Sequence, residues 1–393
     1  MKKTIVTLIV LALAAAPFLS AQNQADEDYI KAMTESDPCK RVQGLKEFVA
    51  KHGGKGSQYE NFAYAHLCLT PCPTKPPKES IEYGEKALTF KGLDDLTRVQ
   101  VLLTLSGLYS ELGQNLDKAQ AHAGTAIAVG RANKDKEPSE AAQWTSIMGA
   151  GHFAQGQALE KAKDFKGAVD AYVNAYGLLK NPQILAALKK TAKILYDGKN
   201  YAEAERAFRA AYSVSKDHEA GTMLALTLLR AGKQDEALPL FKESYAKKRT
   251  GELAYNIGII LARKAKTDSR QADEAIRYLL EASFLYPSQS KQAMSLAESL
   301  FFTANKELRY NENIKEMQEK VAYLNEITAD YNKRFGDKSD EELTAADKRA
   351  IQTLTENIEA QKAAIQKLEA AQKAAVDKFN ALIADTKKRL GVK

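Results

Sequence analysis

The chain has 393 residues, of which 45% are hydrophobic and 27% charged, and its formal net charge is +7. These proportions are those of a folded, soluble protein, and they exclude a largely disordered chain. Basic and acidic residues are interspersed along the sequence, so they do not form the clustered basic surface of a nucleic-acid-binding protein. We therefore expect no nucleic-acid partner.

Residues 1–21 have the pattern of a secretory signal peptide. Lys2 and Lys3 precede an apolar run over residues 5–16, and small residues end the segment. The run is too short to cross a bilayer, and no later segment reaches the ~18 apolar residues that a span needs. We expect a mature chain that begins near Gln22, has no transmembrane segment and is periplasmic or secreted. An uncleaved anchor is the alternative.

Residues 22–56 are expected to form an N-terminal helical cap of two helices. Asp37 followed by Pro38 is a helix-start signal, because the Asp side chain caps free backbone amides and Pro fits the first turn. A glycine-rich loop over residues 53–56 follows. The loop lacks the spacing of a phosphate-binding loop and comes after a helix, so we interpret it as a connection.

A spaced pattern predicts helix pairs through the middle of the chain. A Gly or Ala is followed by an Ala, then by a bulky residue, then by a small one, and the central alanines Ala168, Ala204 and Ala237 lie 36 and 33 residues apart. A period of this length predicts stacked units that cannot bury their apolar faces alone. The three occurrences are Gly156, Ala168, Tyr172 and Ala175, then Ala192, Ala204, Phe208 and Ala211, then Ala225, Ala237, Phe241 and Ser244.

This pattern resembles the tetratricopeptide repeat, in which small residues occupy the positions where paired helices cross. The resemblance covers roughly residues 57–289. It implies an all-α fold, a right-handed superhelical solenoid of helix pairs whose first helices line a concave groove, and a protein or peptide partner bound there. The last pair carries the motif on Ile257, Gly258, Leu261, Ala275, Leu279, Ala282 and Pro287.

The resemblance also gives candidate groove residues, at the exposed positions of the first helices. Aromatic side chains and Met beside Lys, Arg and Asn suit a peptide or helix with an acidic flank. The alternative is that several of them only contact the neighbouring repeat or the C-terminal helix. The candidates are Phe153, Gln157, Lys189, Lys193, Tyr196, Met223, Leu226, Arg230, Tyr255 and Asn256.

The period changes over residues 290–393, where apolar residues have a heptad-like spacing. We expect a long helical hairpin or coiled coil in which residues 290–335 and 341–390 pack antiparallel around a turn near Gly336. Pairing of the same helices between two chains, and hence self-association through 290–390, is the alternative. The seam residues are Ile314, Met317, Val321, Leu324, Tyr331 and Phe335 on one side and Ile351, Leu354, Ile358, Ile365, Leu368, Phe379 and Leu382 on the other.

Residues suited to chemistry are few. Cys39, Cys68 and Cys72 are the only cysteines, and in an oxidising compartment two of the three are expected to form a disulfide. Adding His66 gives an alternative zinc-binding set. The histidines are scattered and no hydrolase motif is present, so we expect no catalytic residue, no cofactor and no metal.

The sequence therefore predicts a non-enzymatic, exported scaffold that binds a protein partner in a groove of helix pairs. The alternative is a structural subunit of a cell-envelope complex that docks through its C-terminal helical hairpin. The residues do not name the partner.

Overall fold

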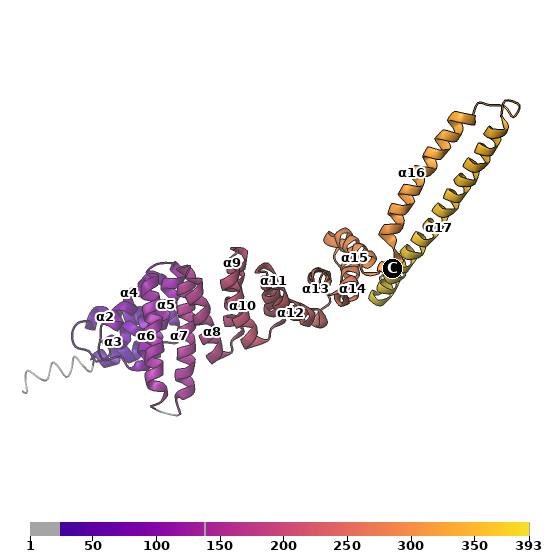
Figure 1. The fold of residues 1–393 in the computed structure, drawn as a ribbon. Coiled ribbons are helices and arrows are strands. Elements are labelled where there is room, and N and C mark those ends of the chain that lie inside the picture. Colours follow the sequence, from indigo (N-terminus) through magenta and orange to yellow (C-terminus); the bar gives the residue numbers. More distant parts are fainter. Residues whose placement is uncertain (1–23, 137–138, 393) are drawn as a thin grey trace, which may run out of the picture. The chain divides into compact units, whose positions relative to one another are not determined.

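A computed structural model describes residues 24–136 and 139–392 (Figure 1). Every regular element in these ranges is helical, and none of the helices combines the length and apolar character needed to cross a membrane. The predicted signal peptide lies outside the described residues. The chain divides into two compact units at Ala231 and Gly232, inside the solenoid expected over 57–289. The right-handed superhelical path of that solenoid stays a prediction.

The N-terminal unit is a succession of helices in which each contacts the next. A helix over residues 24–34 comes first, and α5, α6 and α7 pack against one another (Figure 1). The helices are α2 (Pro38–His52), α3 (Glu60–Leu69), α4 (Pro77–Leu88), α5 (Asp95–Leu112), α6 (Leu116–Lys134), α7 (Ala141–Lys161), α8 (Phe165–Leu179), α9 (Pro182–Asp197), α10 (Tyr201–Ser215) and α11 (His218–Arg230).

Short polar side chains begin most of these helices. The Asp37 carboxylate accepts the backbone amides of Cys39 and Lys40, as the Asp-Pro start signal predicts. The side chains of Asp94, Asp164, Asn181, Asn200 and Asp217 cap α5, α8, α9, α10 and α11 in the same way. Each cap satisfies an amide that has no partner inside its helix.

The backbone of the turns repeats with the sequence period. Lys163 and Lys199, 36 residues apart, have φ of 62° and 61°, and Lys180 and Lys216, again 36 apart, have φ of 51° and 52°. Non-glycine residues seldom adopt this left-handed conformation. Its recurrence at the same step shows that α7–α8 and α9–α10 are two copies of one structural unit.

Small residues stand where paired helices cross. Ala168, Ala204 and Ala237 are fully buried. A Cβ added to Gly156 of α7 would lie 2.5 Å from the Tyr172 ring of α8, closer than real Cβ contacts allow. The crossing distance in this pair is therefore set by the absence of a side chain at one position.

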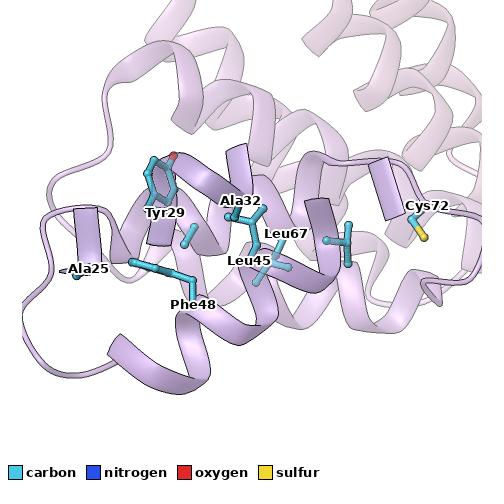
Figure 2. Close-up of a cluster of buried hydrophobic side chains, with 9 residues drawn as sticks. Ala25, Tyr29, Ala32, Leu45, Phe48, Leu67 and Cys72 are labelled. Atoms are coloured by element: carbon cyan, nitrogen blue, oxygen red, sulfur yellow. The ribbon is translucent and has the colours of Figure 1, made fainter. Parts of the chain in front are cut away.

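The first helices enclose a hydrophobic cluster that includes Tyr29, Leu45, Phe48 and Leu67 (Figure 2). The Tyr29 ring stacks on Tyr59 and meets Phe48 edge to face. This packing attaches the helix over 24–34 to α2 and α3, so the segment predicted as a cap shares its core with α3.

The C-terminal unit begins with further helices and ends with two long ones. Pro287 starts a short 3-10 helix after α14, and another, η1 (Ser269–Gln271), lies between α13 and α14. The remaining helices are α12 (Gln234–Lys247), α13 (Gly251–Ala265), α14 (Ala272–Leu285), η2 (Pro287–Gln289), α15 (Ser290–Ala304), η3 (Lys306–Leu308), α16 (Tyr310–Phe335) and α17 (Ala345–Leu390).

The long helix expected from residue 290 to 335 is divided in two. α15 ends at Ala304 and packs on α14, and α16 begins only at Tyr310. Between the two helices lie the short helix η3 and Arg309, which has a left-handed φ of 46°. The Phe302 and Tyr310 rings then stack with their centroids 3.7 Å apart across the break. The first of the two long helices thus starts at residue 310 and not at residue 290.

The end of α17 packs back on α14 and α15. Phe379 is buried against Phe301 and Phe302. The Arg389 guanidinium donates to the Glu281 carboxylate at 3.0 Å, and Glu281 also accepts the Tyr245 hydroxyl proton. α17 therefore covers the apolar face that α15 would otherwise leave open.

α16 and α17 lie side by side over most of α16 (Figure 1). Ile327 and Phe335 are the apolar residues that α16 buries. Val321, expected in the seam, is 40% exposed. Phe335, two heptads further on, lies on the same line of the helix as Val321, so this line is buried near the turn and exposed at Val321. Pairing of these helices within one chain in solution stays a prediction.

Candidate partner-binding groove

A groove of about 660 Å³ opens between α5, α7 and α9, the first helices of three successive pairs. Its floor is apolar and its rim is polar, and one fully buried aromatic ring from α8 forms part of the wall. The lining residues are Leu103, Thr104, Gly107, Leu108, Ser110, Glu111, Gln157, Glu160, Lys161, Tyr172, Ala187 and Lys190.

A hydrogen-bonded carboxylate fixes one wall of the groove. Glu160 of α7 accepts the Tyr172 hydroxyl and the Thr191 hydroxyl, each at 3.0 Å, and the Lys190 ammonium at 2.9 Å. Its side chain is only 16% exposed. Three donors from two helices, α8 and α9, therefore hold one side chain of α7, and the groove wall is preorganised.

The same contacts decide the charge of this carboxyl. Burial raises the pKa of Glu160, but the hydrogen bonds from Lys190, Tyr172 and Thr191 outweigh it and the net pKa lies below its ordinary value of 4.5. Burial and the nearby carboxylate raise the pKa of the Tyr172 phenol. At neutral pH the wall therefore holds a fixed anion and a phenol that keeps its proton.

Gly107 of α5 lines the groove and, having no side chain, leaves part of it unfilled. A Cβ added there would meet nothing within 4 Å, whereas one added to Gly156 would strike the Tyr172 ring. The two glycines thus have opposite roles. Gly156 permits a helix crossing, and Gly107 leaves open space beside Leu103 and Leu108.

Of the candidate residues from the sequence, Gln157 lines this groove. Phe153, one turn earlier on α7, is half-buried with its ring centroid 5.8 Å from that of Tyr172. It therefore supports the wall from behind more than it offers a free surface.

Both candidate lysines, Lys189 and Lys193, form ion pairs within the chain. Lys189 bonds Asp217 at 3.2 Å and also pairs with Glu219. Lys193 pairs with Asp197 one turn along α9 at 2.8 Å. Lys189 thus has two carboxylate partners within the chain, the capping residue Asp217 of α11 and Glu219 two residues later. Binding of an acidic flank by these lysines stays a prediction.

The remaining candidates lie outside this groove. Tyr196 meets Tyr201 edge to face and hydrogen-bonds Arg230, which raises the pKa of that guanidinium. Met223 and Leu226 are half-buried on α11. Tyr255 and Asn256 belong to the C-terminal unit, where Tyr255 packs beside Tyr286.

Sequence reasoning missed the α5 side of the groove altogether. α5 is apolar around most of its circumference, so its pattern does not separate Leu103, Gly107 and Leu108 from ordinary core residues. One feature of the sequence could have indicated it. A helix that is apolar on all sides and has a glycine in its interior is expected to pack two faces on other helices and to line a concave surface with a third.

The cysteines form one cross-link. Cys39 at the start of α2 bonds Cys72 in the loop after α3, and Cys68 is a buried free thiol. Burial raises the pKa of the Cys68 thiol to about 12, so it is not an activated nucleophile. In the described part of the chain no cluster of three or more His, Cys, Asp or Glu side chains is placed to hold a metal ion.

Helix pairs with a repeating turn geometry, small residues at the crossings and a groove lined by first helices define the class of protein. It is an all-helical protein built from repeated helix pairs.

Comparison with known proteins returned three solved structures of interest. The chain is similar to a tetratricopeptide repeat protein from Parabacteroides merdae, at 15% identity over 71% of this chain and 99% of that one, with a TM-score of 0.34. It is similar to the apo form of RapI at 12% identity over 70% and 99%, with a TM-score of 0.37. It is also similar to yeast Tom70 at 14% identity over 92% and 98%, with a TM-score of 0.19.

No family model matches the chain, and no curated protein matches it. The solved structures are too distant to carry an argument about function. Only the residues of this chain therefore bear on what the groove binds.

Proposed function

We propose that this protein is a non-enzymatic interaction scaffold that holds a segment of a protein partner in the groove between α5, α7 and α9. The observation that carries the proposal is the open space at Gly107 in a wall otherwise fixed by the Glu160 hydrogen bonds. A rigid concave surface binds with a small loss of conformational entropy.

The chemistry of the lining limits the partner segment. Leu103 and Leu108 suit one or two apolar side chains, and Glu111 and Lys161 at the rim suit polar groups of either sign. The groove has no dominant charge. It fits an amphipathic helix or extended segment held by an apolar anchor, with polar contacts that fix its direction.

Filling the groove floor tests the proposal. Gly107→Trp places an indole in the open space, and Gly124→Trp places the same ring on α6, where an added Cβ also meets nothing within 4 Å. A partner captured with the wild-type mature chain and with Gly124→Trp should be reduced at least about tenfold with Gly107→Trp, because hot-spot contacts dominate binding. Quantitative mass spectrometry of crosslinked pull-downs gives the measurement. Equal recovery with both variants would remove the groove from the function.

We further propose that the protein is exported and acts in the periplasm or outside the cell. The support is the signal-peptide pattern of residues 1–21 together with the Cys39–Cys72 disulfide, a bond that persists in oxidising compartments. N-terminal sequencing of the mature protein should find a start near Gln22.

A second function is favoured by one observation, the long pair of helices α16 and α17 that bury few residues of their own. In this alternative the helical pair docks on a cell-envelope complex. The outcome that favours it is a partner retained by Gly107→Trp and lost on charge reversal at the turn between α16 and α17.

A further inference from the structure

A second cavity, of about 590 Å³, lies in the C-terminal unit. It opens between the start of α14, the end of α15 and the last turns of α17, and we call it the terminal pocket. Its inner wall is apolar, because Ile276 and Leu280 of α14 pack with Phe301 of α15 there. Leu382 of α17 adds an apolar side chain that is 39% exposed. Cavities of this volume are typical of sites for small ligands that have an apolar part and a few polar groups.

Two of the four charged side chains that line the terminal pocket are bonded to each other. The Arg389 guanidinium donates to the Asp385 carboxylate at 3.0 Å. It also donates to the Glu281 carboxylate at 3.0 Å and to the Thr386 hydroxyl at 3.2 Å. Each of its three nitrogens therefore has a partner within the protein. Arg389 and Asp385 form a fixed part of the wall and are not the groups from which a ligand would gain most.

The other two charged side chains of the terminal pocket, Asp273 and Arg277, are exposed and have few partners. Asp273 has no ion pair or hydrogen bond within the described part of the chain. Arg277 lies 3.5 Å from Glu274, whose carboxylate also accepts the Lys242 ammonium at 2.9 Å. The Arg277 guanidinium stands over the Tyr278 ring, 4.9 Å from its centroid. That contact orients the guanidinium and leaves its N–H donors available to a ligand.

Asp273 and Arg277 lie four residues apart on one face of α14, yet they do not form an ion pair with each other. Side chains with this spacing leave a helix about 5–6 Å apart. The pocket therefore presents a carboxylate and a guanidinium side by side, each able to take a partner. Its four charged side chains sum to zero, so a ligand that carries only one sign of charge gains no net attraction. A zwitterion, with a cation for Asp273 and an anion for Arg277, is complementary to both.

We propose that the terminal pocket binds a small apolar zwitterion, namely an apolar dipeptide with free termini. Two extended residues span about 7 Å, which is close to the spacing of Asp273 and Arg277 along α14. The terminal carboxylate accepts N–H groups of Arg277, and the terminal ammonium donates to Asp273. The two apolar side chains then lie against Phe301 and Leu382. A free amino acid carries both charged groups on one carbon, so it spans the two side chains less well.

The terminal pocket is independent of the groove. Gly107 belongs to the N-terminal unit, and every residue that lines the terminal pocket belongs to the C-terminal unit. Gly107→Trp should therefore leave dipeptide binding unchanged, and substitutions in the terminal pocket should leave recovery of the groove's protein partner unchanged.

Titration with defined dipeptides tests the ligand class. Isothermal calorimetry of the mature chain with leucyl-leucine should give a Kd below about 1 mM, as expected for a ligand of this size. N-acetyl-leucyl-leucine lacks the ammonium and leucyl-leucine amide lacks the carboxylate, and each should bind at least about tenfold more weakly. The proposal is overturned if leucyl-leucine does not bind at about 10 mM, or if either blocked dipeptide binds as tightly as the free one.

Substitutions in the pocket test the place of binding. Arg277→Gln should weaken leucyl-leucine at least about tenfold and bind the amide no more weakly than the free dipeptide, because the carboxylate then has no guanidinium to recognise it. Asp273→Asn should in the same way abolish the difference between leucyl-leucine and its N-acetyl form. Arg270→Gln is the matched control, since Arg270 belongs to the same unit, is 87% exposed and does not line the pocket. Wild-type affinity in Arg277→Gln, or an equal loss in Arg270→Gln, would exclude the terminal pocket as the site.

Discussion

Glycines inside helices have two different structural roles in this fold. Gly156 and Gly124 both lie inside helices, but a Cβ on Gly156 meets the ring of Tyr172 at 2.5 Å and a Cβ on Gly124 meets nothing within 4 Å. Glycine in a helix interior is less favourable than alanine by about 1 kcal/mol. An added methyl group therefore gains helix propensity at both positions and meets a packing penalty only at Gly156.

We expect Gly124→Ala to stabilise the N-terminal unit by about 0.5–1 kcal/mol. Gly156→Ala should destabilise it by about 1–3 kcal/mol, because the Tyr172 ring is fully buried and bonded to Glu160 and cannot move aside. Chemical denaturation of both variants gives the comparison. Two shifts of the same sign would mean that the helices do not cross at Gly156.

At this scale the sequence predicted the crossings well and the groove poorly. The burial of Ala168, Ala204 and Phe208 is predictable because buried small and bulky residues recur at a fixed spacing. The ion pairs of Lys189 could not be predicted, because they come from the capping residue of the next first helix, Asp217, and from Glu219 two residues later. A sequence pattern shows which face a residue is on, but not which charges reach it.

Among the elements, α16 and α17 depart furthest from the sequence expectation. The seam predicted from the sequence begins at Ile314, and residues 290–313 were joined to it without a signal for the break between α15 and α16. The break depends on the conformation of Arg309 and the stacking of Phe302 on Tyr310. Those are tertiary effects, and a periodic pattern does not contain them.

The hairpin itself gives a prediction at this scale. Cysteines in place of Leu324 and Leu354, in a chain without the native three, should crosslink within one monomer under dilute oxidation. The nine-residue connection 336–344 makes closure within the chain entropically cheaper than pairing between chains. Denaturing electrophoresis reads the result.

A product at dimer mass would mean that α16 pairs with α17 of another chain. That outcome would show that helices are exchanged between copies of the chain. The single-residue control, Leu324→Cys alone, should remain monomeric.

The whole molecule consists of two units that differ in how they are held together. The N-terminal unit contains all three cysteines, and its disulfide joins residues 33 apart. The C-terminal unit contains no cysteine and is held by apolar contacts, hydrogen bonds and ion pairs. Reduction therefore acts on one unit and spares the other.

Replacing Cys39 and Cys72 together by Ser should lower the stability of the N-terminal unit by about 3–4 kcal/mol, the loop-closure entropy of a bridge of this span. Hydrogen exchange followed by mass spectrometry resolves the two units within one sample. Peptides of α2 and α3 should exchange faster, and those of α13 and α14 should not change. Equal acceleration in both units would show that the chain unfolds as one cooperative body.

The packing of α17 on α14 and α15 has a consequence for the order in which the molecule is completed. Neighbouring helices of the N-terminal unit close on each other as soon as they are made, because their contacts are local. Phe301 and Phe302 can contact Phe379 only after the end of α17 has been synthesised. Glu281 likewise precedes its partner Arg389 by 108 residues. Until the last turns of α17 are synthesised, the aromatic side chains of α15 lack the cover of Phe379. The Glu281 carboxylate also lacks the Arg389 guanidinium. A chain that ends before Phe379 therefore keeps this aromatic surface exposed. We expect quality-control proteases that recognise exposed apolar surface to degrade it in preference to the complete protein.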